Sequence, residues 1–73
     1  SRFFRDITGQ NLFNYLIDYR IERSLALLSG TDMPVSAIAS ATGFAGQSYY
    51  AKCFSERKGI TPVEYRKRTR REV

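Results

Sequence analysis

The chain has 73 residues, a formal net charge of +5, one cysteine and no histidine. A chain this short forms one domain that buries about 60% of the surface its unfolded form exposes, and its lone Cys53 and lack of histidine exclude internal disulfides, the usual zinc sites and histidine-based catalysis. No apolar run approaches the roughly 18 residues of a membrane span and no leader precedes the first predicted helix, so we expect a soluble, cytoplasmic protein without a cofactor.

Glycine and proline divide the chain into helical segments. Residues 1–7 are typical of a short helix end, which Thr8 and Gly9 close. Asn11 offers an N-cap for a long amphipathic helix over residues 11–29, in which apolar residues recur every three to five positions. The apolar face predicted for this helix consists of Leu12, Leu16, Ile21, Leu25 and Leu28.

Shorter helices follow Pro34, which prevents a simple continuation of the long helix. One begins near Val35, a second covers about 47–58, and Thr61 caps a final helix over 61–69 whose first position is a proline. No stretch alternates with period two over a useful length, so the sequence predicts an all-α fold.

The turn between residues 35 and 58 has the spacing of a helix-turn-helix. Ala39 is small, which lets the following helix cross it, and Gly43 four residues later suits a turn with positive φ. We expect Phe44 to fold back into the core, and Tyr50 and Phe54 to anchor the second helix on the first. An ordinary αα-hairpin has the same Ala-x-x-x-Gly spacing, so spacing alone leaves both interpretations open.

The outward face of the second helix carries small and polar side chains rather than the usual glutamates and lysines. Its residues are Gln47, Ser48, Ala51, Lys52 and Ser55. Glutamine can form hydrogen bonds with adenine, lysine with guanine or a phosphate, and serine with a base or a phosphate. The alanine methyl can contact a thymine methyl. This face therefore suits the DNA major groove. Gly46 has no side chain to cover the helix N-terminus, so the free N–H groups there can approach a phosphate. Tyr49 and Arg57 are expected on the flanks, the tyrosine with its ring on the domain and its hydroxyl towards the DNA backbone.

The net positive charge lies entirely in the second half of the chain. Residues 1–36 carry four basic and four acidic side chains, whereas residues 37–73 carry eight basic and three acidic ones. This asymmetry indicates a polyanionic partner, or alternatively a solubilising tail. The basic run over 66–71 either contacts phosphates or is simply solvated.

Several motifs agree at once with a known pattern. They are Arg20-Ile21-Glu22-Arg23, Leu27-Leu28, Val35-x-x-Ile38-Ala39, Gly43-Phe44, Ser48-Tyr49-Tyr50, Phe54, Lys58-Gly59-Ile60-Thr61-Pro62 and Glu64-Tyr65-Arg66. Over nearly the whole chain they resemble the DNA-binding domain of AraC/XylS-type bacterial transcription regulators.

The resemblance implies a homeodomain-like bundle of two helix-turn-helix units joined by a long linker helix. Residues 35–58 correspond to the complete second unit, and residues 1–9 to a remnant of the first recognition helix, in which Arg2 and Arg5 would face DNA. Arg20 corresponds to a common arginine that either ties the linker helix to the second unit or meets a phosphate. The implied partners are double-stranded DNA and RNA polymerase, and the intact protein is expected to have a separate effector domain. The protein is expected in the cytoplasm, associated with the nucleoid.

Other classes of function have less support. The sequence offers no nucleophile–base pair, no paired carboxylates and no phosphate-cradling glycine motif, so we expect no enzyme. The main alternative is a small basic helical module that binds an acidic protein. Adsorption to an anionic membrane has less support, because the basic tail lacks the apolar face that such a segment needs. Cys53 is expected to pack beside Phe54, with a redox role as the minority interpretation because no second cysteine exists.

Overall fold

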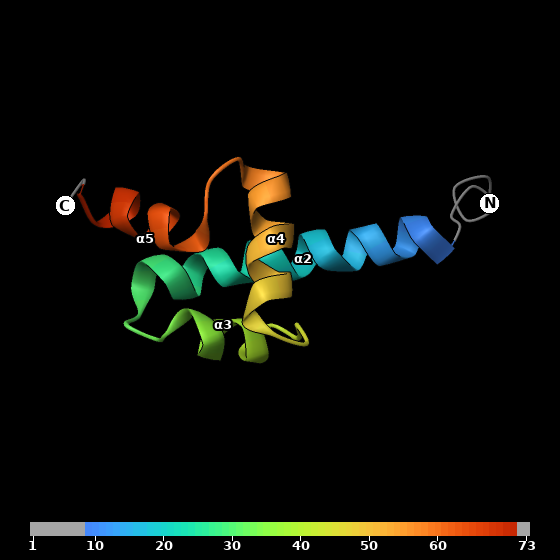
Figure 1. Ribbon diagram of the computed structural model, residues 1–73, viewed down its shortest axis with the longest axis horizontal. Helices are drawn as coiled ribbons and strands as arrows, with labels where there is room; N and C mark the ends of the chain where they lie inside the picture. Colours follow the sequence, from blue (N-terminus) through green and yellow to red (C-terminus); the bar gives the residue numbers. More distant parts are fainter. Residues whose placement is uncertain (1–8, 72–73) are drawn as a thin grey trace.

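The computed structural model describes residues 9–71, and within this range it contains four helices and no strand (Figure 1). The helices are α2 (Gly9–Gly30), α3 (Val35–Ala41), α4 (Gln47–Lys58) and α5 (Pro62–Arg71). The expected all-α fold is therefore confirmed over the described range. No helix in that range combines the length and the apolar character needed to cross a bilayer. The expected remnant helix, with Arg2 and Arg5, lies outside the described residues.

The long helix α2 differs from its prediction in where it begins and in which face it buries. It starts at Gly9, two residues before the expected N-cap Asn11. Its predicted apolar residues Leu12 and Leu16 are 51% and 37% exposed, so their assignment to the buried face was wrong. The predicted residues Ile21 and Leu28 are buried together with Ile17 and Ser24, and each of these four is at most 1% exposed.

The arrangement of the helices explains this difference. The other helices gather around the second half of α2, whereas its N-terminal half extends away from them (Figure 1). Apolar periodicity marks which residues share a face of a helix, but only contact with other elements decides which part of that face is buried.

Local signals fix the ends of the shorter helices. Gly43 and Gly59 have φ values of 97° and 80°, a region that favours glycine. The N–H of Gly59 closes α4 by donating to the carbonyl of Ser55 at 2.9 Å. Thr61 caps α5 as expected, because its hydroxyl oxygen accepts the N–H of Glu64 at 3.1 Å.

An aromatic row forms the centre of the core. The ring centroids of Phe44 and Tyr50 are 5.1 Å apart, those of Tyr50 and Phe54 5.9 Å, and those of Phe54 and Tyr65 5.8 Å. Phe44 is 6% exposed, and Tyr50 and Phe54 are fully buried, which confirms all three as core residues. Each such side chain contributes about 1.5–3 kcal/mol through burial, and edge-to-face contacts add to this.

Arg66 joins the last helix to the end of the first. Its guanidinium donates to the backbone carbonyls of Leu28, Met33 and Thr31 at 2.9, 2.7 and 3.2 Å. The last carbonyls of a helix lack intrahelical partners and carry partial negative charge, so a cation is well suited to this place. The end of α2 and the loop that follows it are therefore held by α5.

Candidate nucleic-acid interface

Buried anchors turn one side of α4 towards the core. Tyr50 and Phe54 are 0% exposed and Cys53 is 5% exposed. Cys53 is thus a buried packing residue, as expected. The N-terminus of α4 at Gly46 has no side-chain cap, so the first N–H groups of the helix are not covered by a capping side chain.

Ser48, Lys52 and Ser55 lie on the side of α4 opposite the anchors with Ala51 at its edge, whereas Gln47 is exposed at the N-terminal end of the helix. Gln47, Ser48 and Lys52 are exposed, and Ala51 and Ser55 are half-buried. Within the part of the chain that the structure describes, no side-chain hydrogen bond or ion pair engages the polar members of this set. We call these five residues the outer face of α4. Its donors and acceptors remain available for another molecule.

Tyr49 borders the outer face. Its ring is 40% exposed and meets the ring of Phe44 edge-on, with centroids 5.9 Å apart. Desolvation and the neighbouring Cys53 thiol raise the pKa of Tyr49 above its usual value. The hydroxyl therefore stays protonated at neutral pH and can donate a hydrogen bond, for example to a phosphate oxygen.

The turn before α4 lies against the side chain of Arg20 in α2. A side chain at Gly43 would place its Cβ 3.0 Å from Nε of Arg20 and 3.3 Å from Cζ, in a backbone conformation that L residues rarely adopt. The amide of Phe44 donates to the carbonyl of Ala39 at 2.9 Å, which holds the turn on α3. The side chain of Arg20 in α2 therefore lies beside the turn before α4, and the choice between its two expected roles stays a prediction.

Most of the basic side chains in the second half have partners inside the protein. Arg57 pairs with Asp18, Lys58 with Glu22 at 2.6 Å, Arg68 with Glu64 at 3.5 Å and Arg70 with Asp32 at 2.9 Å, and Arg66 binds backbone carbonyls. Lys52 and Lys67 are exposed and, in the described part of the chain, have no such partner. Much of the charge asymmetry is thus engaged by partners within the protein.

Sequence reasoning missed the two carboxylates that meet the end of α4. Asp18 and Glu22 are four residues apart and therefore on one face of α2, opposite the basic last turn of α4. This spacing was the available signal. The flank residue Arg57 is consequently engaged by Asp18 rather than free.

Comparison with known proteins identifies the family. Residues 1–68 match the family described as helix-turn-helix domain. The chain belongs to the AraC-type helix-turn-helix family. This AraC-type domain is a DNA-binding domain rather than an enzyme. No solved structure matches it.

The similar relatives are bacterial regulators. The AraC-type domain is 34% identical over 68 residues to the "HTH-type transcriptional activator RhaR" of Yersinia pseudotuberculosis serotype O:1b (strain IP 31758) and of Yersinia pestis bv. Antiqua (strain Angola). It is 37% identical over 68 residues to the protein of the same name from Enterobacter sp. (strain 638). These matches cover 93% of this chain but 23–24% of the relatives, so the domain spans about a quarter of their length.

Proposed function

We propose that α4 is a recognition helix that enters the major groove of double-stranded DNA. Gln47, Ser48, Ala51 and Lys52 meet base edges, while Tyr49 and Ser55 lie towards the phosphates. The observation that carries the proposal is the outer face of α4, which is small and polar, has no side-chain partners among residues 9–71, and belongs to a helix held by two fully buried aromatic anchors. Such a face allows close approach of the helix backbone to the bases.

The dimensions of α4 are compatible with this mode of binding. Its 12 residues correspond to about 18 Å of helix. Ser48, Lys52 and Ser55 follow one another at i, i+4 and i+7 and so form a single row. The major groove is about 12 Å wide and admits one helix, so this row can lie along the base edges.

The wider role follows from the relatives. We propose that the domain belongs to a transcriptional activator in the bacterial cytoplasm, with a separate effector-sensing domain and a contact to RNA polymerase. In this proposal residues 35–58 are the second helix-turn-helix unit, α2 is the linker, and residues 1–9 belong to the recognition helix of a first unit, with Arg2 and Arg5 in the adjoining groove segment. The similarity to transcriptional activators and the match over residues 1–68 support it.

The test is a selection of random duplexes by the full-length protein, followed by affinity measurements at matched salt. We expect the selected duplex to be bound at least about a thousandfold more tightly than random sequence. Lys52→Ala should weaken binding and relax the preference at one base pair, whereas Lys67→Ala, the matched control, should weaken all sequences alike. Binding without sequence preference, together with capture of an acidic protein, would favour the alternative of an interaction module.

A further inference from the structure

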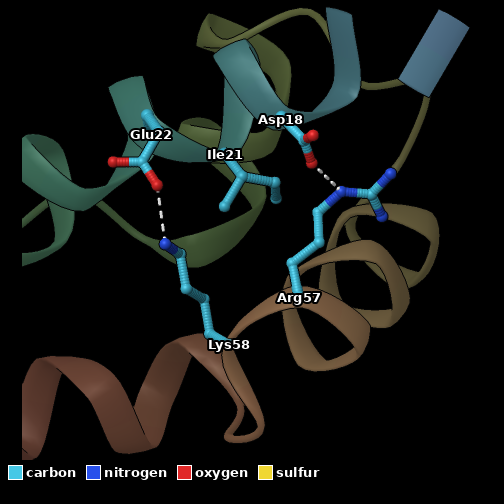
Figure 2. A pocket seen from close by; sticks show the side chains of 5 residues that line it. All are labelled: Asp18, Ile21, Glu22, Arg57 and Lys58. Atoms are coloured by element: carbon cyan, nitrogen blue, oxygen red, sulfur yellow. Dashed lines mark hydrogen bonds and ion pairs between the residues drawn. The ribbon is translucent and has the colours of Figure 1, made fainter. Parts of the chain in front are cut away.

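Two ion pairs join the last turn of α4 to the middle of α2 (Figure 2). Nε of Arg57 donates to a carboxylate oxygen of Asp18, and Nζ of Lys58 lies 2.6 Å from Oε2 of Glu22. In Figure 2, Ile21 lies between the two pairs. Two successive residues of α4 are thereby connected to two points one turn apart on α2.

These ion pairs are poorly placed to stabilise the fold. The side chains of Asp18 and Glu22 are 61% and 60% exposed. Exposed pairs of this kind are screened by salt and contribute little to stability. The stability of this contact comes from the apolar side chains beneath it, since Ile21 and Phe54 are at most 1% exposed. The pairs therefore call for another physical role.

Their position gives them control over the tilt of α4. This helix lies across α2, so the two helices meet over a short stretch (Figure 1). The buried Phe54 is about 4.5 Å along the helix axis from Arg57 and about 9 Å from Ser48, at 1.5 Å per residue. If α4 tilts about Phe54, a displacement at Arg57 is doubled at Ser48. Recognition contacts tolerate about 0.5 Å of displacement, so even a small shift at the ion pairs disturbs them.

We propose that Asp18 and Glu22 are positioning residues for DNA recognition. By holding Arg57 and Lys58, they fix the angle at which α4 presents its outer face to the bases. The inference rests on the proposed function, because it concerns the same recognition helix.

The experiment compares the full-length wild type with the double variant Asp18→Asn, Glu22→Gln. The amides keep the size of the side chains but remove both negative charges. We expect the melting temperature to change by only a few degrees and the affinity for the selected duplex to fall about tenfold, which corresponds to the loss of roughly one base contact. Affinity for random duplex should stay the same or rise, because the protein becomes more positive.

A matched control and a rescue separate positioning from general effects. Glu64→Gln removes another exposed ion pair, but this pair lies within α5, so the ratio of specific to random affinity should not change. Exchanging the charges by Asp18→Arg with Arg57→Asp should restore part of the ratio that Asp18→Arg alone loses.

Each remaining outcome is decisive. If the wild type shows no sequence preference, the proposed function fails and this inference fails with it. If the wild type discriminates and the double variant keeps the same ratio, only the positioning role is overturned. A large loss of melting temperature with parallel weakening on both DNAs would also overturn it, because the carboxylates would then be structural.

Discussion

Replacing Arg66 with alanine is expected to destabilise the domain by about 2–4 kcal/mol. The guanidinium makes three hydrogen bonds to backbone carbonyls, at 2.7 to 3.2 Å. Bonds to a charged group contribute about 1.5–3 kcal/mol each when taken singly. The sum is smaller here, because the carbonyls are part-buried and water replaces some of the lost donors. Domains of this size have a free energy of unfolding of only about 5 kcal/mol, so the variant should keep only about 1–3 kcal/mol of stability and unfold at a much lower urea concentration.

Urea denaturation followed by circular dichroism measures this effect. Arg66→Lys should recover less than half of the loss, because an ammonium group cannot match the fork of a guanidinium against three carbonyls. The neighbouring Lys67→Ala provides the control and should stay within about 0.5 kcal/mol of wild type, since Lys67 is exposed. An Arg66→Ala variant as stable as the control would refute the assignment of Arg66 as a cap of α2.

Three further outcomes are expected. Gly43→Ala should lower the free energy of unfolding, measured by thermal denaturation, by about 1–3 kcal/mol, because φ is 97° there and the new Cβ would lie close to the Arg20 side chain. Gly46→Ala should lower it much less, because a Cβ there meets open space. Tyr50→Phe should leave the melting temperature unchanged or raise it, because the buried hydroxyl has no hydrogen-bond partner within residues 9–71; a clear loss would indicate a hydrogen bond with the neighbouring Ser24 hydroxyl. Replacing Lys67 with alanine should make the log–log salt dependence of DNA binding shallower by about 0.9, the loss of one phosphate contact, whereas Lys52→Ala at a base contact should change the slope less.

The helix-turn-helix was predictable because its signals are local. Gly43, Phe44, Tyr50 and Phe54 fall within 12 consecutive residues, and backbone sterics and helical spacing act over that distance. The same spacing places Ser48, Lys52 and Ser55 opposite these anchors. Whether that face contacts DNA stays a prediction that the binding experiments must test.

The parts that could not be predicted depend on contacts between distant residues. Leu12 and Leu16 fit an apolar stripe, but the elements that pack on α2 reach only its second half in the described structure. Arg66 finds carbonyls 33 to 38 residues earlier in the chain, and Arg57 finds Asp18 39 residues away. In the sequence such arginines look like members of a solvated basic run, because nothing local distinguishes a cation that will be bound internally.

The internal engagement of the cations affects how the protein responds to polyanions. Folding ties up five basic side chains, namely Arg57, Lys58, Arg66, Arg68 and Arg70. In the native protein these cations already neutralise nearby carboxylates or carbonyls, so they release few counterions when a polyanion binds. The log–log salt dependence of heparin binding should therefore be shallower than the eight basic side chains of residues 37–73 would suggest.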